Sequence, residues 1–494
     1  MKRILAIASA ALLVDVSEAQ GGVVQWGIQK RPLPVDWRRL RRRNGTFEEV
    51  VTNEDHKGGY FATCQLGTPA QELTLQLDTG SSDIWVPDSN AAVCSDGSKG
   101  GCDLGTFTPK RSSTFEVVGK NTFDISYVDG SSSTGDYFTD VFEIGGAVVD
   151  NMTMGLGLRT TIPYGLVGVG YALNEAIVSD TQSASSAYPN LPVSMVDAGF
   201  INTVAYSLWL NDLDANSGNI LFGGIDTEKF VGDQLTRIDI YPTQNVFTSF
   251  LVAFTSLQAY SPSGSDTLTS TQFPVPAVLD SGTTLSYLPT DLAQQSWKEA
   301  GAIYSSQFQL AVIPCQMKNS KGYFSFGFAG PKGPRINVTM DELVLDLTEG
   351  PPPVFNTGPY KGLDACEFGI QNFTSAPFLL GDTFLRSAYV VYDLLNHQIG
   401  IAPTKFNTTK SNIVPFPSLS AHIPSATTAP DQSQATSRPS VTSPAYAASA
   451  GFTDSAGIKS AAPGIVAAVG AVQLSIMGMS MLFALSDSGV FSIL

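Results

Sequence analysis

LQLDTGSSDIWVP at residues 75–87 and AVLDSGTTLSYLP at residues 277–289 are two versions of one pattern, about two hundred residues apart. In each, an Asp follows an apolar run and precedes a hydroxyl residue, a Gly and a second hydroxyl residue. A single such motif is a common turn, so one alternative is that Asp78 and Asp280 only cap two strands. The duplication with matching flanks favours two related lobes that bring two carboxylates face to face.

The composition fits a large β protein with more than one domain. The 494 residues are 43% hydrophobic and include 46 Gly and 29 Pro, which is typical of strands joined by many turns. Short β-rich runs alternate with turn clusters between about residues 55 and 405, and no long helical pattern occurs there. We therefore predict an all-β fold with short helices, an N-terminal lobe at residues 55–230 and a C-terminal lobe at residues 231–405.

The charge of the chain is unevenly distributed. The whole chain has 28 Lys and Arg against 44 Asp and Glu, but residues 1–43 hold nine of the bases and three of the acids. The remainder has 19 bases and 41 acids, a formal charge of −22. A body this acidic repels phosphate backbones, so we expect no nucleic-acid binding.

The amino-terminal residues have the features of an exported precursor. Lys2 and Arg3 precede an uncharged run and then small residues, which predicts a signal peptide at residues 1–19. Residues 20–43 end in a basic cluster with several dibasic pairs, and we interpret them as a removable prosegment whose cations can occupy an acidic cleft until cleavage. The alternative is a solvated basic arm that is never cut.

The carboxyl-terminal residues change in character. Of residues 416–450, 25 of the 35 are Ser, Thr, Pro or Ala, so we predict an extended stalk at residues 412–457 that cannot bury enough apolar area to fold. Residues 464–485 are then uncharged, which is long enough to cross a bilayer, and no Lys or Arg follows them.

Two membrane interpretations fit this ending. A permanent transmembrane helix usually keeps basic residues on its cytoplasmic side, whereas a glycosylphosphatidylinositol (GPI) signal ends in its hydrophobic tail. We therefore predict a GPI-attachment signal at residues 458–494, with the attachment residue within 451–457. The predicted location is the outer face of the plasma membrane, through a GPI anchor in the lipid bilayer, or the cell wall; the alternative is a transmembrane helix.

Cysteine and asparagine patterns agree with export. Five cysteines are too few and wrongly spaced for a zinc framework, and the economical pairing is local, Cys94 with Cys102 and Cys315 with Cys366. Cys64 is left over in a strand-like run and is expected to be a buried free thiol. Five Asn-x-Ser/Thr sequences predict N-glycosylation at Asn44, Asn151, Asn337, Asn372 and Asn407.

Over about residues 55 to 405 the chain resembles the pepsin-like aspartic peptidases. The two Asp-Thr/Ser-Gly motifs, the flap-like YVDG at residues 127–130 and one disulfide in each half occur in the order of that family. GLVGVG at residues 165–170 and FLLGDT at residues 378–383 are a further pair of echoes, expected to be strands that pass close behind the active-site loops. The basic prosegment, the Ser/Thr-rich tail and the GPI-like end are similar to the fungal yapsin branch, although no long acidic insertion occurs in the N-terminal lobe.

The resemblance implies a bilobal pepsin-like fold with an active-site cleft between the lobes. It also implies that Asp78 and Asp280 are the catalytic pair, because two carboxylates that share a proton can activate water and polarise a carbonyl at once. In this family such a pair is known to lose its two protons in separate steps. Ser81 and Thr283 would hold the outer carboxylate oxygens. Gly80 and Gly282 would let the two loops approach without a Cβ clash.

The resemblance also predicts a flap over the substrate. Tyr127 would lie on this hairpin with its hydroxyl bonded to Trp85, whereas the alternative for both rings is core packing. If the hairpin continues as a strand, Asp129 projects to the same side as Tyr127, towards the pocket for the side chain before the scissile bond, where it would favour Lys or Arg. The alternative for Asp129 is a turn residue before Gly130.

Other hydrolase classes lack their essential residues in this chain. Three histidines without a His-Glu-x-x-His motif exclude a common zinc peptidase, and no Gly-x-Ser-x-Gly is present. We predict an endopeptidase that uses no metal or other cofactor, takes protein or peptide substrates at acidic pH, and is a monomer. The rival of another class is a catalytically inert pepsin-like binding or wall protein at the cell surface.

Overall fold

The structure is a computed structural model, which describes residues 22–31, 59–95, 101–215, 217–233, 235–348, 350–430, 432 and 441–458. The predicted signal peptide, Asn44 and the predicted GPI signal beyond residue 458 lie outside these ranges. Within the described residues, no helix is both long and apolar enough to cross a membrane.

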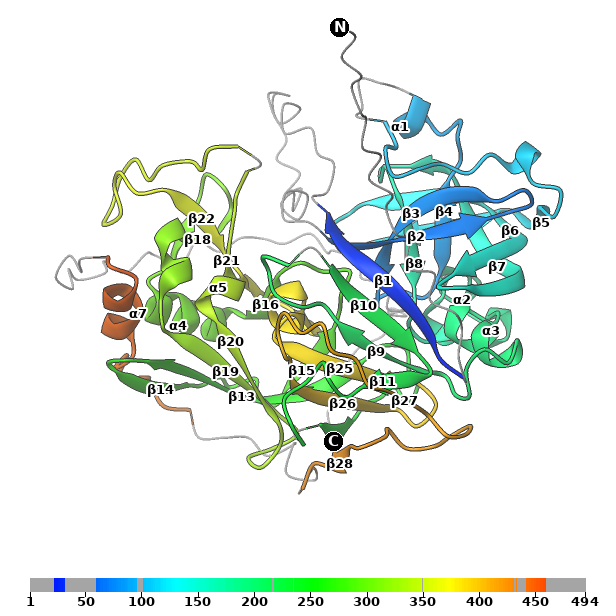
Figure 1. Ribbon diagram of the computed structural model, residues 1–494. Coiled ribbons are helices and arrows are strands. Elements are labelled where there is room, and N and C mark those ends of the chain that lie inside the picture. Colours follow the sequence, from blue (N-terminus) through cyan, green and yellow to red (C-terminus); the bar gives the residue numbers. More distant parts are fainter. Residues whose placement is uncertain are drawn as a thin grey trace, which may run out of the picture.

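The chain forms two lobes of β structure, one formed mostly by the first half of the chain and one by the second (Figure 1). The predicted mainly β, bilobal fold is confirmed. The helices are short: α1 (Ala92–Ser95), α2 (Ala176–Thr181), α3 (Leu191–Asp197), α4 (Thr290–Ala300), α5 (Met340–Leu343), α6 (Asp382–Leu385) and α7 (Ser449–Ser455), with 3-10 turns η3 (Pro109–Arg111), η4 (Ala172–Asn174), η5 (Ala184–Ser186) and η6 (Cys315–Asn319).

The largest sheet joins the two halves of the chain. In spatial order it contains β28 (Thr427–Thr428), β12 (Thr236–Asp239), β26 (Gln398–Pro403), β25 (Ala388–Asp393), β9 (Ala205–Trp209), β10 (Ser217–Phe222), β1 (Val24–Arg31), β2 (Gly59–Leu66), β3 (Gln71–Asp78), β8 (Gly165–Gly168), β4 (Ile84–Pro87), β7 (Ala147–Thr160), β6 (Ser132–Ile144) and β5 (Glu116–Ser126). Because β25, β26 and β28 come from the second half of the chain, the lobes share this sheet and are not separated along it.

Smaller sheets complete the second lobe. The main one contains β20 (Arg335–Thr339), β19 (Tyr323–Phe328), β13 (Leu251–Ser261), β15 (Val275–Leu279), β24 (Phe378–Leu380), β16 (Ser286–Pro289) and β23 (Ile370–Phe373), with β14 (Gly264–Leu268) paired to β13. The others are β17 (Ile303–Ser305), β18 (Leu310–Pro314), β22 (Ala365–Phe368) and β21 (Val344–Leu345), and the pair β11 (Gly224–Asp226) and β27 (Ile413–Pro415).

The sequence duplication corresponds to a structural one. In the first lobe β3 runs parallel to β8 while β4 runs antiparallel to the same strand. In the second lobe β15 and β16 have the same relation to β24. A Cβ on Gly168 would lie 2.6 Å from Ser82 N, and one on Gly381 would lie 2.2 Å from Thr283 O. The predicted close passage of a strand behind each Asp-containing loop is confirmed.

The amino-terminal strand is part of the main sheet. β1 lies inside the range predicted as a removable prosegment, yet it pairs with β10 on one side and β2 on the other. Trp26 and Ile28 are buried, and Lys30 Nζ donates to Leu213 O at 2.7 Å. Removal of the prosegment would therefore require a paired strand to leave the sheet.

The Ser/Thr/Pro/Ala-rich region packs on the body in two places, which corrects the expectation of an extended stalk. Residues 413–430 pair through β27 and β28, and Phe416 and Ile423 are buried. Further on, Phe452 of α7 is fully buried against the second lobe. A few apolar side chains suffice because each enters a site that the body has already built, so the segment needs no core of its own.

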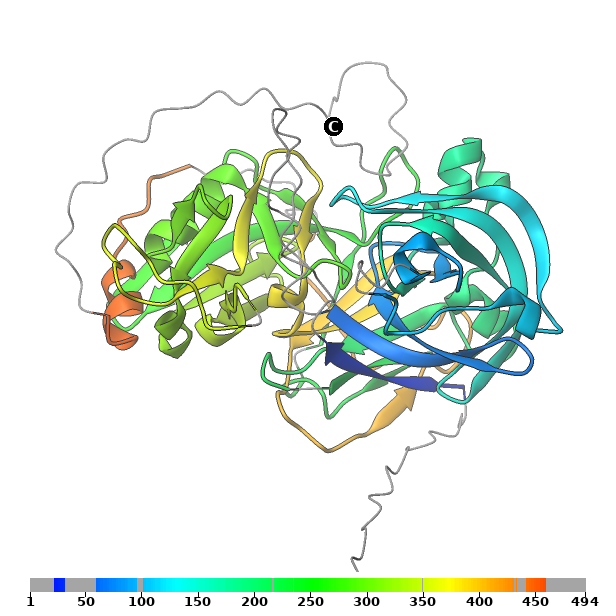
Figure 2. The ribbon, with the colours of Figure 1, turned by 90° about the horizontal axis from the view of Figure 1, so that it is seen from above.

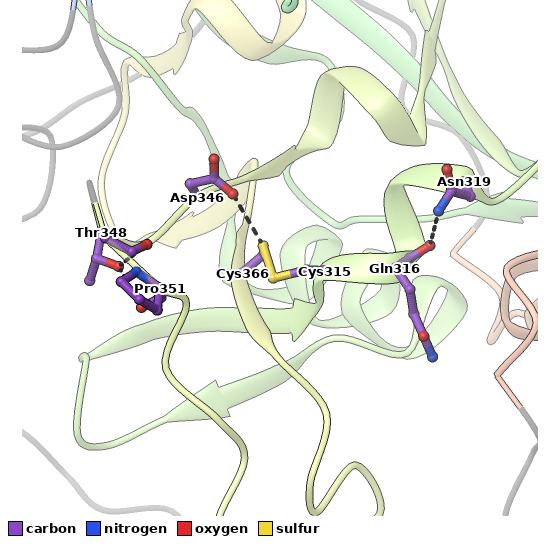
Figure 3. Close-up of a disulfide and its surroundings, with 8 residues drawn as sticks. Cys315, Gln316, Asn319, Asp346, Thr348, Pro351 and Cys366 are labelled. Atoms are coloured by element: carbon purple, nitrogen blue, oxygen red, sulfur yellow. Dashed lines mark hydrogen bonds between the residues drawn. A yellow bond between two sulfur atoms is a disulfide. The ribbon is translucent and has the colours of Figure 1, made fainter.

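Both predicted disulfides are confirmed. Cys94 and Cys102 are joined in the first lobe, and Cys315 and Cys366 in the second, while Cys64 is buried and free. Figure 3 shows the second bridge, where Cys366 Sγ lies 3.7 Å from an Asp346 carboxylate oxygen. This bridge links the 3-10 turn η6 to strand β22, across 51 residues of sequence.

Four predicted glycosylation sites fall on the described surface. Asn151, Asn337 and Asn407 are exposed and Asn372 is partly exposed. Their occupancy by glycans stays a prediction.

Candidate active site

Asp78 and Asp280 occupy equivalent positions in the two lobes. Asp78 is the last residue of β3, and Asp280 directly follows β15. Their side chains are buried, with 4% and 9% of their surfaces exposed. The end of each strand that leads to the Asp is buried, and the loop that follows reaches the other lobe through the hydroxyl groups of Thr79 and Ser281.

The two carboxylates receive matching hydrogen bonds. Gly80 N donates to Asp78 Oδ1 at 2.8 Å, and Gly282 N donates to Asp280 Oδ1 at the same distance. The second oxygens accept from hydroxyl groups: Ser81 donates to Asp78 Oδ2, and Thr283 donates to Asp280 Oδ2 at 2.6 Å. The structure therefore places the predicted glycine and hydroxyl residues as the resemblance implied.

The loops are tied to each other by four crossed hydrogen bonds from Thr79 and Ser281. Thr79 Oγ1 donates to Leu279 O at 3.0 Å and accepts from Ser281 N at 2.9 Å. In the mirror arrangement, Ser281 Oγ donates to Leu77 O and accepts from Thr79 N, both at 3.2 Å. Because each hydroxyl bonds backbone groups of the other lobe, the relative position of the carboxylates is fixed by main chain.

Glycine is required where the loops meet. A Cβ on Gly80 would lie 2.6 Å from an Asp280 carboxylate oxygen, and one on Gly282 would lie 2.3 Å from an Asp78 carboxylate oxygen. Real Cβ atoms do not approach other atoms this closely, so any larger residue would push the carboxylates apart. The same distances show that each loop reaches the Asp of the other lobe.

The electrostatics of the pair follow from this crowding. Burial, and then the neighbouring Asp280 carboxylate, raise the pKa of Asp78 well above its usual range, while the bonds from Ser81 and Gly80 oppose that rise. Two carboxylates that repel each other in a buried site cannot both ionise readily, so the pair keeps one proton to a higher pH than an isolated carboxyl group. The site thus holds a proton acceptor beside a proton donor.

The predicted flap residues Tyr127 and Trp85 are in contact. Trp85 Nε1 donates to Tyr127 Oη at 2.8 Å, and Trp85 is fully buried. Tyr127 N donates to Ser131 O and Gly130 N donates to Tyr127 O, so residues 127–131 form the tight turn of the β5–β6 hairpin. Gly130 has a φ of +81°, a conformation that favours glycine.

The structure corrects the strand geometry assumed for Asp129. This residue lies in the turn and not in a strand, so the alternation of side chains along a strand does not fix its direction. Its Oδ1 accepts from both the backbone N and the hydroxyl of Ser131, at 2.9 and 2.6 Å. Asp129 therefore stabilises the turn, as the alternative interpretation expected, and it does so with one of its two carboxylate oxygens.

Asp83 is a buried acid near the site that the sequence analysis did not single out. Its Oδ1 accepts from the hydroxyls of Tyr137 and Tyr188, at 2.9 and 2.8 Å, and its Oδ2 accepts from Ala176 N at 2.8 Å. Burial raises its pKa and these three bonds lower it. The carboxylate joins the Asp78 loop to the flap strand β6 and to the start of α2. The one sign of this role in the sequence was a charged residue directly before the apolar Ile84 of the first motif.

Comparisons with known proteins agree with this geometry. Residues 59–404 match the family model described as eukaryotic aspartyl protease. The chain is 42% identical over 402 residues to a probable aspartic-type endopeptidase OPSB of Arthroderma benhamiae, across 81% of this chain and 79% of that protein. It is 39% identical over 388 residues to a probable aspartic-type endopeptidase opsB of Aspergillus fumigatus (78% and 76%), and 36% identical over 375 residues to secreted aspartic protease 8 of Candida albicans (75% and 81%).

We predict that Ser81→Ala raises the pKa of the carboxyl pair further. The Ser81 hydroxyl stabilises the ionised form of Asp78, so its loss favours the protonated form. Titration of carboxyl-labelled aspartates by carbon NMR measures the change, with Ser113→Ala, a surface hydroxyl, as the control. An unchanged or lowered pKa in Ser81→Ala would contradict the electrostatic account.

Proposed function

This chain belongs to the eukaryotic aspartyl protease family, and from that premise we propose that Asp78 and Asp280 activate the water that hydrolyses its substrates. The chain is an aspartic-type endopeptidase, so its substrates are proteins or peptides. The observation that carries the residue assignment is the pair of buried carboxylates held by matched hydrogen bonds on crossed loops. An inert binding protein would have no need of this arrangement.

The proposed reaction uses one carboxylate as base and one carboxyl group as acid. The ionised member takes a proton from water, the resulting hydroxide attacks the peptide carbonyl carbon, and the protonated member gives its proton to the carbonyl oxygen. The tetrahedral intermediate then breaks its C–N bond as the protonated member delivers its proton to the leaving nitrogen, while the ionised member takes the proton of one hydroxyl group as that oxygen becomes the new carbonyl. The products are a carboxylic acid and an amine, and the pair again holds one proton. The outer bonds from Ser81 and Thr283 keep both groups oriented through these transfers.

The pair works only while it holds one proton. As the pH rises through the raised pKa of Asp78, the last proton leaves and the acid is lost. Activity should therefore be highest in acid and decline on the alkaline side of the usual carboxyl range. This direction agrees with the acidic body of the chain, which carries less self-repulsion when part of its carboxylates is protonated.

The proposed specificity includes Lys or Arg before the scissile bond. Asp129 Oδ1 is engaged by Ser131, and the support for a substrate contact is the second carboxylate oxygen at the tip of the flap hairpin, next to Tyr127. A partly shielded carboxylate paired with a substrate cation contributes about 1.5–3 kcal/mol.

The proposed location is the outer face of the plasma membrane, as in the fungal yapsin-like branch. The support is the uncharged run at residues 464–485 behind a region of small residues, together with the apolar run after Lys2 and Arg3. The relative in Candida albicans is named as secreted, which agrees with export. We propose that residues 20–43 are removed after export, a step in which β1 must leave the main sheet.

Substitution of either active-site acid tests the mechanism. Asp78→Asn and Asp280→Asn should each lower kcat by at least about a thousandfold, because an amide neither donates nor accepts the required proton. The midpoint temperature of thermal unfolding should be unchanged or higher in both variants, since the repulsion within the pair is removed. The control is Asp140→Asn, which replaces a buried acid in the same lobe as Asp78 and should retain activity. Full activity of either active-site variant would refute the mechanism.

Asp129→Ser tests the specificity. The variant should lose about ten- to a hundredfold in kcat/KM for peptides with Lys or Arg before the scissile bond, and little for apolar residues there. Asp136→Ser in the same hairpin is the matched control. Equal losses on basic and apolar substrates would leave Asp129 with the turn role alone.

Enzymatic release from cells tests the anchor. A phosphatidylinositol-specific phospholipase should free the protein from intact cells, because a lipid anchor ends in a cleavable phosphodiester. Resistance to release, with an intact C-terminal peptide by mass spectrometry, would instead establish a transmembrane helix.

A further inference from the structure

Residues 442–458 lie outside the matched family region, which ends at residue 404, and yet they are folded onto the body. Their helix α7 packs against α4 and β13 of the second lobe. Figures 1 and 2 both show α7 at the outer end of that lobe, on the side away from the first lobe. The docked segment is thus remote from the junction where Asp78 and Asp280 meet.

Phe452 is the apolar anchor of this segment. Its side chain is fully buried, and its ring centroid lies 5.4 Å from that of Phe324 on β19. The ring lies against Gly322, where a Cβ would come within 2.2 Å of it. A side chain at position 322 would therefore displace the ring. Ala448, one turn earlier, is also fully buried.

Directional bonds hold the main chain of the segment to the lobe. Ala448 N donates to Asp266 Oδ2 at 2.9 Å, and Lys298 Nζ lies 3.7 Å from the centre of the Tyr446 ring. Hydroxyl groups of the lobe donate to four backbone carbonyls spread along the segment: Thr269 to Thr442, Ser263 to Ala447 and Ser261 to Ala448 at 2.6 Å, and Ser320 to Phe452 at 2.8 Å. Such bonds specify one register of the segment on the lobe.

We propose that residues 442–458 are a C-terminal latch that docks on the outer face of the second lobe and holds the peptidase body close to the membrane. The part about the membrane rests on the proposed anchoring. With the latch docked, an anchor attached within residues 451–457 lies directly on the outer face of the second lobe. With the latch free, the 21 to 27 residues from 431 to the attachment residue would allow a maximum separation of about 70–90 Å.

The latch covers a pair of acids. Glu299 of α4 is fully buried beside Asp266 of β14, the acceptor of the Ala448 bond; Lys298 and the latch residue Tyr446 are the other ionisable groups that face this pair. Burial, and then Asp266, raise the pKa of Glu299 to about 8. A proton on Glu299 lets it lie beside the Asp266 carboxylate without repulsion, so protonation favours the docked state.

The sign of the pH dependence follows from that raised pKa. Docking is fully stabilised below the usual pKa of a glutamate, weakens as the pH rises from there, and is weakest above about 8, where Glu299 must ionise under the latch. Acidic conditions, in which the peptidase is proposed to work, thus also favour a docked latch.

Amide hydrogen exchange of the purified full chain tests the latch. At pH 5 the amides of residues 448–458 should be protected at least about tenfold over free peptide, and Phe452→Ala should abolish that protection while hydrolysis of a soluble peptide is unchanged. Phe406→Ala, a 37% exposed phenylalanine in the extension before the latch, is the matched control and should change neither. The latch would be overturned if the amides of residues 448–458 exchanged at the free-peptide rate in the unmodified chain, or if they kept full protection in Phe452→Ala.

Glu299→Gln separates the pH effect from the anchor residue. The amide is neutral at every pH and donates to Asp266, so protection of the latch should no longer fall between pH 5 and pH 9. If protection falls equally in Glu299→Gln and the unmodified chain, the acid pair has no part in docking. Both exchange experiments read the latch itself, so they hold whether or not the chain carries a lipid anchor.

The membrane part has its own measurement. A dye on Lys321→Cys, an exposed position beside the latch, should transfer energy efficiently to acceptor-labelled lipid headgroups when the protein is bound to vesicles. Transfer should fall in Phe452→Ala. Equal energy transfer in the two proteins would overturn the short tether. If the protein did not bind vesicles, the anchoring would be refuted, and the docking of the latch would be decided by the hydrogen-exchange experiments alone.

Discussion

The crossed hydrogen bonds that the hydroxyl groups of Thr79 and Ser281 make to the backbone of the opposite loop are the constraint on which the site depends. They tie the backbone of one lobe to the backbone of the other at the point where two buried acids meet. Like charges would otherwise push the loops apart, and the cost is offset because the pair retains a proton. The glycines at positions 80 and 282 are a second consequence, since the loops cross too closely for any Cβ.

The sequence was most informative where the structure repeats itself. The duplicated motif predicted the two lobes, the paired acids and the strands behind them, because each copy is a local pattern with a fixed backbone geometry. Asp83 was missed because its partners Tyr137 and Tyr188 are 54 and 105 residues away, and no local pattern encodes such contacts. Asp129 was placed on a strand because a hairpin motif does not show at which residue strand becomes turn.

Composition did not reveal that both ends of the described chain pack on the body, for one physical reason. A segment poor in apolar residues cannot build a core, but it can be held by a core that already exists. β1 is held by pairing with β2 and β10, and α7 is held by Phe452 in a site built by the second lobe. Both ends of the described chain therefore belong to the folded body, and their release is an event that the body resists.

A double-mutant cycle on Thr79→Val and Ser281→Ala tests most directly whether the crossed bonds set the geometry of the acid pair. Each hydroxyl bonds the backbone of the opposite loop, so either substitution alone should already misalign the carboxylates. The account predicts that kcat/KM losses in the single variants are large and that the double variant loses much less than their product, a coupling of at least about 1 kcal/mol. Losses that multiply, or single variants with unchanged kcat/KM, would contradict the claim.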